Sequence, residues 1–342
     1  MGIGQPRLLP DKSPSKSLAH LATLAETHLS RPFAVRSVVL LGSLAMACAH
    51  ATDSARQGAA PGHVELKFAW PEGFQSHVLI AHESRRSGAD PTVLIARQRL
   101  VTEKKGNEIW VITRDIAARG NEPDLESTVK INEALMQVVT PDGRFRRAEG
   151  LDQALSAIPT TTSDDREKAR QALIRSTAFD WELLVGAWAG EKLAAGQVRR
   201  KQVKAYVPDL QAIESVLEVE YGLEARVPCK DEDTVRRCVE LSYRAHLAPE
   251  DQAATVERLR RATSSKANEP VPEDVHAELE MVLVTEPDTL IPHRMSQREH
   301  RRLRLALPGG RVVETEGRSE DTYVFSDREQ QVPAPENAPS AL

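Results

Sequence analysis

The sequence predicts an α+β protein that is mainly antiparallel β, with long curved sheets in two related halves and a few helices inserted between them. Three observations predict this class: long runs that alternate apolar and polar residues, a few helical stretches in the middle of the chain, and a proline–glycine hairpin pattern that occurs twice. Of the 342 residues, 40% are hydrophobic and 28% are charged, which is typical of a folded globular protein.

Alternation of apolar and polar residues marks the expected strands, because neighbouring side chains on a strand point to opposite faces of its sheet. In the clearest run, Leu217, Val219 and Tyr221 alternate with Glu218 and Glu220. One apolar and one polar face indicate antiparallel strands that meet water on one side. The same pattern predicts strands at 63–70, 75–84, 92–103, 108–115, 135–140, 143–149, 217–227, 239–247, 275–283 and 303–307.

Helices are expected mainly between the two halves. Thr162 or Ser163, followed by acidic residues, is the predicted N-terminus of a helix that runs to about Ser176. Asp180 is the predicted cap of a second helix. A third helix, near 249–263, begins with a proline, which suits the first helical turn.

The second of these helices carries an apolar stripe that is a candidate binding site. A spacing of i, i+3, i+4 and i+7 places four side chains on one face, namely Trp181, Leu184, Val185 and Trp188. Two interpretations stay open. The stripe packs as core against the sheet, or it lines a cavity in which a hydrophobic ligand lies.

A short apolar segment near the N-terminus predicts export. Residues 37–47 carry no charge and are too few for a membrane-spanning helix, which takes about 20 residues, but they fit the apolar region of a signal peptide. Arg36 precedes the segment, and Ala45–Ala47 satisfies the small-x-small rule for cleavage before Cys48. We therefore expect a signal peptide at 1–47 and a protein on the periplasmic or extracellular side of a bacterial membrane.

A cysteine directly after such a site resembles the lipobox of bacterial lipoproteins. This resemblance implies that Cys48 is acylated and anchors the chain to a membrane, whereas cleavage after Ala49 or Ala51 would leave no anchor. Residues 1–47 hold five basic and two acidic residues, so their removal takes the net charge from −5 to −8. An acidic mature chain gives no reason to expect nucleic acid as a partner.

Composition divides the mature chain into five parts. Small and polar residues predict a flexible tether at one end and a proline-rich disordered tail at the other. The expected order is the tether at 48–62, a first β-rich half at 63–150, a helical insert at 151–212, a second β-rich half at 213–326 and the tail at 327–342.

The two halves share a hairpin pattern. The ten residues from Pro141 to Gly150 line up with those from Pro308 to Gly317, and the proline, second glycine, arginine and final Glu-Gly recur in register. Each copy predicts a hairpin with proline early in the turn and glycine where φ is positive. Either the halves are duplicated, or two unrelated hairpins share their turn chemistry.

With these hairpins, the sequence resembles uncharacterised bacterial secreted proteins and lipoproteins built from long meandering strands, over roughly residues 63–325. The curved sheet that such strands imply looks like the half-barrel carriers that handle lipoproteins and lipids in the cell envelope. The resemblance implies a sheet partly wrapped around helices.

Cys229 and Cys238 flank a charged loop between two expected strands. A hairpin would place them face to face at its mouth, within reach of a disulfide, which an oxidising compartment favours. Free thiols are the first alternative. A zinc site is the second and would need two more ligands.

No motif of catalytic or cofactor chemistry is found: the chain has no G-x-S-x-G, no P-loop, no G-x-G-x-x-G and no H-E-x-x-H. We therefore predict a protein that is not an enzyme and holds no cofactor or metal. Acidic residues that alternate along strands, such as Glu278 and Glu280, indicate a solvated face or, alternatively, a cation site. The basic run from Arg294 to Arg304 indicates solvated strand surface or contact with anionic lipid.

The predicted function is non-catalytic binding or scaffolding in the cell envelope. A carrier or sensor of a hydrophobic ligand is the sharper hypothesis. The alternative is an interaction module that docks another envelope protein through its strand edges or its acidic face, which includes Glu218 and Glu220. A hydrolase that uses unassigned carboxylates is a third hypothesis.

Overall fold

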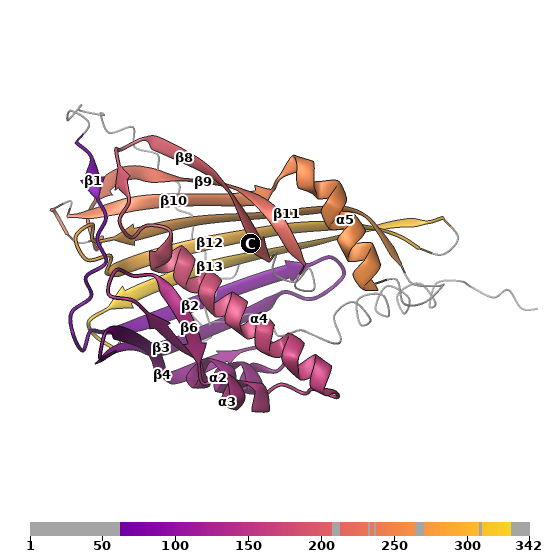
Figure 1. Ribbon diagram of the computed structural model, residues 1–342, viewed down its shortest axis with the longest axis horizontal. Coiled ribbons are helices and arrows are strands. Elements are labelled where there is room, and N and C mark those ends of the chain that lie inside the picture. The colour runs from indigo at the N-terminus through magenta and orange to yellow at the C-terminus, as the bar shows by residue number, and fades with distance from the viewer. Residues whose placement is uncertain are drawn as a thin grey trace, which may run out of the picture.

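The computed structural model describes residues 62–206, 213–231, 233–235, 237–263, 270–307 and 310–329. The predicted signal peptide, Cys48, the predicted tether up to residue 61 and residues 330–342 of the predicted tail lie outside the described residues. The described part is mainly antiparallel β with four α-helices, so the predicted fold class is confirmed (Figure 1).

Eleven strands form one open antiparallel sheet, in the order β6-β5-β4-β3-β2-β13-β12-β11-β10-β9-β8. Strands that follow one another along the chain are neighbours in this sheet, except that β6 and β8 are its two edges. Strand β2 pairs with β13, which joins the two predicted halves into one sheet. The strands are β2 (Gln75–Arg86), β3 (Thr92–Lys105), β4 (Glu108–Gly120), β5 (Met136–Val139), β6 (Phe145–Glu149), β8 (Gln197–Tyr206), β9 (Glu214–Val227), β10 (Cys238–Leu247), β11 (Val271–Thr285), β12 (Pro292–Ala306) and β13 (Val312–Ser326).

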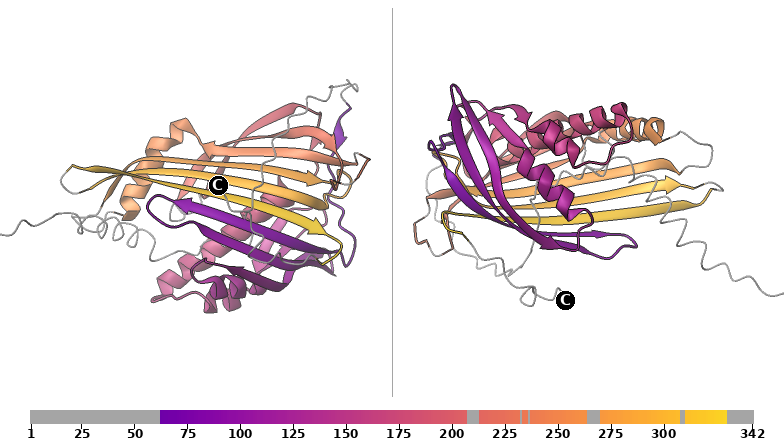
Figure 2. Two further views of the ribbon diagram at one scale, coloured as in Figure 1. Left: turned by 180° about the vertical axis from the view of Figure 1, so that it is seen from behind. Right: turned by 90° about the horizontal axis from the view of Figure 1, so that it is seen from below.

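The helices lie on one face of this sheet, which bends around them (Figure 2). We call this face concave and the opposite face, on which none of the described helices lies, convex. A separate two-stranded sheet pairs β1 (Val64–Glu65) with β7 (Lys192–Leu193). The helices are α2 (Leu125–Ala134), α3 (Leu151–Ser156), α4 (Ser163–Trp181), the π-helical turn η1 (Glu182–Gly186) and α5 (Pro249–Thr263).

Burial follows the predicted alternation. Leu217, Val219 and Tyr221 of β9 are buried on the concave face, whereas Glu218 and Glu220 between them are partly exposed on the convex face. The same periodicity on β10 and β11 places alternate apolar residues in one continuous core. The apolar half of each strand therefore supplies the packing, and the polar half meets water.

The expected strand at 63–70 is wrong beyond its first residues, because only Val64–Glu65 is a strand. Phe68 and Trp70 are buried, as the alternation predicts. Their backbone, however, bonds to a loop: the Lys67 amide donates to the Pro287 carbonyl at 2.8 Å. Figure 1 shows this segment running across the ends of the long strands and not alongside them.

Helix α4 begins as predicted but does not end as predicted. The Thr162 hydroxyl accepts a hydrogen bond from the Asp165 amide at 3.1 Å, which caps the helix. The prediction that Asp180 caps a second helix is wrong, because α4 continues without a break to Trp181 and then enters η1. A π-helical turn holds more residues than an α-helical turn, so it rotates the side chains that follow it.

The sequence does not predict α2, α3, β8 or most of β12. Strand β8 lies within the expected helical insert and is the edge strand next to β9. It carries a run of basic residues, Arg199, Arg200 and Lys201, in place of clear alternation. Charged residues are common on edge strands because they discourage pairing with other chains, and they also weaken the sequence signal of a strand.

The described residues of the two proline–glycine hairpins share a closing hydrogen bond and a glycine with positive φ. In the first, the Thr140 amide donates to the Arg144 carbonyl at 2.9 Å, and in the second the Leu307 amide donates to the Arg311 carbonyl at 2.7 Å. The glycines in equivalent places, Gly143 and Gly310, have φ of 85° and 82°. The two hairpins are therefore alike in these described features, while a duplication of the whole halves stays a prediction.

Gly143→Ala is expected to cost about 2–4 kcal/mol of the free energy of unfolding, because it combines a strained backbone with a clash. A Cβ atom at this position would lie 2.8 Å from the Cβ atom of Phe68. Gly310→Ala is the matched control: its φ is also positive, but nothing lies within 4 Å of the added carbon. It should cost about 1–2 kcal/mol. Urea unfolding measures both, and equal losses would contradict the packing of Gly143 on Phe68.

Candidate binding face of the curved sheet

Two chain segments cover the apolar part of the concave face. They are residues 64–70 and residues 181–193, and we call them together the cover. Strands β1 and β7 pair the two segments with each other, and their apolar side chains share one core cluster with strands β9, β10, β11 and β13. Trp188 lies edge-on to Tyr221 and Tyr243, with ring centroids 6.1 and 6.4 Å apart. The cover therefore meets the sheet through large aromatic rings.

The predicted apolar stripe lies in this cover. Trp181, Val185 and Trp188 are 0% exposed, and Leu184 is partly buried against the same core. Two hollows open elsewhere on the described surface. One, of about 240 Å³, lies between β2 and β3, and the other, of about 540 Å³, lies beside α2 and α3; the stripe lines neither. In this structure the stripe packs as core.

Hydrogen bonds join the cover to turns at one end of the sheet and to strands β8 and β9. The indole nitrogen of Trp70 donates to the Leu290 carbonyl at 3.0 Å, and that of Trp181 donates to the Gly143 carbonyl at 2.7 Å. Glu191 forms an ion pair with an arginine of β8 and accepts a hydrogen bond from the Tyr221 hydroxyl of β9 at 3.4 Å. The other described side chains that the cover packs on the concave face are mainly apolar and aromatic.

A buried polar cluster lies where the concave face of β2, β12 and β13 becomes polar. Asp321 lies between His82 on one neighbouring strand and Gln297 on the other. The Nδ1 atom of His82 lies 3.1 Å from the Oδ1 atom of Asp321. Two more groups are buried without a hydrogen-bond partner among the described residues: the Oδ2 atom of Asp180 and the hydroxyl of Tyr323. The sequence reasoning missed this cluster, because its members come from the β12–β13 hairpin and from β2 and α4, which are far away along the chain.

Burial changes the proton affinity of these groups. It raises the pKa of Asp321 from an ordinary 3.8 to about 7, although the interaction with His82 opposes the rise. Burial, together with the nearby carboxylates of Glu299 and Asp321, raises the pKa of Asp180 well above its usual range. Burial and the same kind of neighbours also raise the pKa of Tyr323. The cluster can therefore hold protons near neutral pH.

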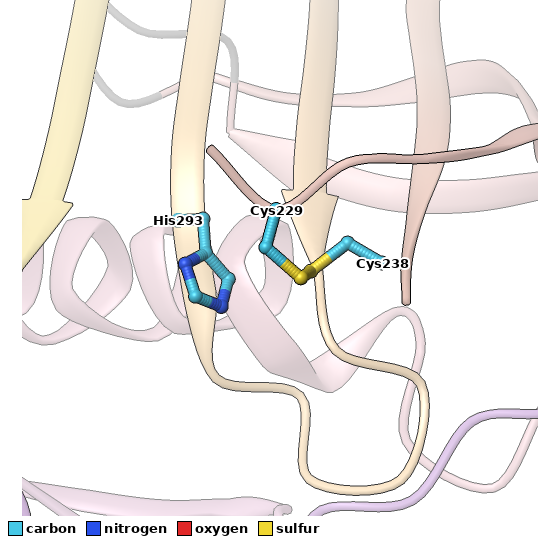
Figure 3. Close-up of side chains that lie close together, drawn as sticks. All are labelled: Cys229, Cys238 and His293. Atoms are coloured by element: carbon cyan, nitrogen blue, oxygen red, sulfur yellow. A yellow bond between two sulfur atoms is a disulfide. The ribbon is translucent and has the colours of Figure 1, made fainter. Parts of the chain in front are cut away.

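The predicted disulfide between Cys229 and Cys238 is confirmed. The bond joins the residues after β9 to the start of β10, with Cα atoms 5.0 Å apart. Figure 3 shows His293 beside it. One nitrogen of His293 lies within 4.8 Å of both sulfur atoms, but sulfur atoms bonded to each other are not thiolate ligands for a metal. His293 instead places its Nε2 atom 3.2 Å from Oε1 of Glu286.

Replacing both Cys229 and Cys238 with serine is expected to lower the free energy of unfolding by about 2–3 kcal/mol, because the bond limits the unfolded chain over a sequence separation of 9 residues. Urea unfolding with and without a reducing agent measures the loss. Reductant should destabilise the wild type by the same amount and leave the double variant unchanged. A wild type that is insensitive to reductant would contradict the prediction.

A second group of possible metal ligands lies on the convex face. It consists of His276 and Glu278 on β11 and His300 on β12, and one ligand atom from each lies within 4.8 Å of the others. The sequence reasoning predicts no metal site, because His300 approaches the other two only through the pairing of the strands.

The basic run on β12 is paired with carboxylates on the neighbouring strands. Arg298 lies 2.8 Å from Glu320, and Arg302 lies 3.8 Å from Asp274. The convex face is therefore a set of alternating acidic and basic columns. This arrangement supports the interpretation of the run as solvated strand surface, because its charges are balanced locally.

Among the described helices, none combines the length and apolar character needed to cross a membrane. No protein-family model matches the chain, and no curated protein matches it. A solved structure described as lipid–protein interactions in lipovitellin aligns with a TM-score of 0.37 and 10% sequence identity, over 81% of this chain and 27% of that chain. The chain thus spans little more than a quarter of that protein, and a similarity at this level carries no argument about function.

Proposed function

We propose that this chain is a non-catalytic binding protein that holds a hydrophobic ligand, such as an acyl chain, between the concave face of the sheet and the cover. One observation carries the proposal: the cover packs on the concave face mainly through apolar side chains, while the indole nitrogens of Trp70 and Trp181 donate to turns at the rim. A hydrogen bond of 3.4 Å from the Tyr221 hydroxyl to Glu191 also joins the cover to β9. An acyl chain can take the place of the apolar side chains without leaving buried polar groups unpaired.

The size of the apolar face also supports a ligand of this kind. Buried apolar and aromatic side chains from β9, β10, β11 and β13 form one continuous surface beneath the cover. Each methylene group of the ligand that is buried would contribute roughly 0.8 kcal/mol to the free energy of binding. This contribution would offset the loss of the contacts made by the side chains that the ligand displaces. Because the core is closed in this structure, binding requires the cover to move away from the sheet.

Quenching of tryptophan fluorescence by a brominated fatty acid tests the proposal. Trp188 lies in the cover, whereas Trp110 lies on β4, where Val111 and not Trp110 joins the core. Trp110→Phe should leave most of the quenching in place, and Trp188→Phe should remove a large part of it. Quenching that depends on Trp110 alone, or no saturable quenching, would overturn the proposal.

The alternative of a docking module on the acidic face has less support. Glu218 lies 3.1 Å from His246, and Glu220 lies 2.7 Å from Arg200. These carboxylates are already paired within the chain, so a basic partner would have to displace their present partners.

We further propose that the chain is exported and anchored through Cys48. The apolar segment at 37–47 supports export, and the Cys229–Cys238 disulfide supports an oxidising compartment, since such bonds rarely persist in the cytosol. Metabolic labelling with a fatty acid analogue tests the anchor. The wild type should be labelled and Cys48→Ser should not, and an unlabelled wild type would remove the anchor from the proposal.

A further inference from the structure

We propose that His276, Glu278 and His300 form a binding site for one divalent transition-metal ion, of the zinc type, on the convex face of the sheet. One ligand atom from each side chain lies within 4.8 Å of the others. The ligand atoms around a tetrahedral zinc ion lie about 3.4 Å apart, because each is about 2.0–2.1 Å from the metal. Small side-chain rotations are therefore enough to close the site around an ion.

Strand register sets the positions of the three ligands. His276 and Glu278 are two residues apart on β11 and so point to the same face, and His300 lies directly opposite Glu278 on β12. The rings of the two histidines have centroids 5.7 Å apart, and the Nε2 atom of His276 lies 3.9 Å from Oε2 of Glu278. Both strands are paired on each side, so the backbone that carries the ligands is held in place.

The ligand set matches the chemistry of the ion. Two imidazoles and one carboxylate are a set that zinc accepts, with water in the fourth position. His300 also has an outer partner, since its Nε2 atom lies 2.8 Å from Oε1 of Glu316. An ion bound at the other ring nitrogen would leave this hydrogen bond in place. Carboxylate partners of this kind orient a ligating histidine and increase its basicity.

The neighbouring positive charges are balanced by other carboxylates. Arg244 lies 3.7 Å from Glu278 but also pairs with Glu280. Arg302, which lies opposite His276 in the sheet, is 3.8 Å from Asp274. The carboxylate of Glu278 can therefore exchange Arg244 for a metal ion without leaving that arginine unpaired. All three ligands are partly exposed, so an ion can reach them from solvent.

Titration of the untagged, chelator-treated chain with Zn²⁺ against a chromophoric chelator tests the site. We expect one ion per chain. His276→Ala, His300→Ala and Glu278→Gln should each weaken binding by at least about tenfold, because even the loss of an outer partner of a metal ligand typically costs 10–100-fold. Circular dichroism should show an unchanged fold, since the three side chains lie outside the core.

His293→Ala is the matched control. His293 lies beside the disulfide and next to Glu286, away from the three proposed ligands. This substitution should not change the affinity. Absence of binding, or binding that survives both His276→Ala and His300→Ala, would overturn the proposal. An equal loss in the control would also overturn it, because the ion would then bind elsewhere.

Discussion

Trp188→Ala is expected to lower the free energy of unfolding by about 3–5 kcal/mol. Trp188 is 0% exposed, its ring lies against Tyr221 and Tyr243, and its indole nitrogen donates to the Leu183 carbonyl at 2.8 Å. The substitution leaves a cavity in a close-packed core and removes the aromatic contacts. Urea unfolding followed by circular dichroism measures the loss.

Trp110→Ala is the control for this prediction. Trp110 is partly exposed on β4, with the Lys105 ammonium 3.7 Å from its ring centroid. Its loss should cost less than about 2 kcal/mol, because less apolar surface is buried. Equal losses for the two alanine variants would contradict the central position of Trp188.

The cavity in Trp188→Ala also bears on the proposed function. A fatty acid that enters beneath the cover should raise the melting temperature of this variant more than that of the wild type, because it fills the space that the indole ring leaves. An equal rise in both would indicate binding outside the core.

Asp321→Asn is expected to stabilise the protein at pH 8 by up to about 4 kcal/mol and to leave its stability at pH 4 nearly unchanged. Asp321 is only 5% exposed, and burial raises its pKa from an ordinary 3.8 to about 7. Between these two values the unfolded chain has released the proton of Asp321 while the folded chain still holds it. The folded state therefore loses stability as the pH rises from about 4 to about 7, and asparagine removes this loss.

Urea unfolding of wild type and variant at several pH values measures this difference. Glu320→Gln is the matched control, because Glu320 lies on the same strand but on the convex face, 2.8 Å from Arg298. Its effect should stay below about 1 kcal/mol at each pH. A stability difference between Asp321→Asn and wild type that is the same at pH 4 and pH 8 would contradict the raised pKa.

Local sequence patterns predicted the strand faces well. Val219 and Tyr221 are buried and Glu218 and Glu220 are partly exposed, because alternation along one strand depends only on that strand. The Thr162 cap and the Cys229–Cys238 disulfide were predicted for the same reason, since their partners lie close along the chain.

Patterns were misleading where a contact from elsewhere in the chain decides the structure. The alternation at 63–70 is real, yet the segment lies across the strand ends and pairs as a strand only at Val64–Glu65. Asp180 looks like a helix cap in sequence but lies inside α4, with a buried carboxylate. A buried carboxylate oxygen without a described hydrogen-bond partner costs free energy, and the packing of the surrounding core has to offset that cost.

The sequence by itself determined that the chain is an antiparallel β protein with one apolar face per strand, tight proline–glycine turns and a hairpin closed by a disulfide. The tertiary structure alone decided that both halves join at β2 and β13, that Asp321 meets His82, and that His276 and Glu278 meet His300. The physical reason is register: which residues lie opposite each other depends on strand order and on packing of the whole core, and neither is written in any single segment.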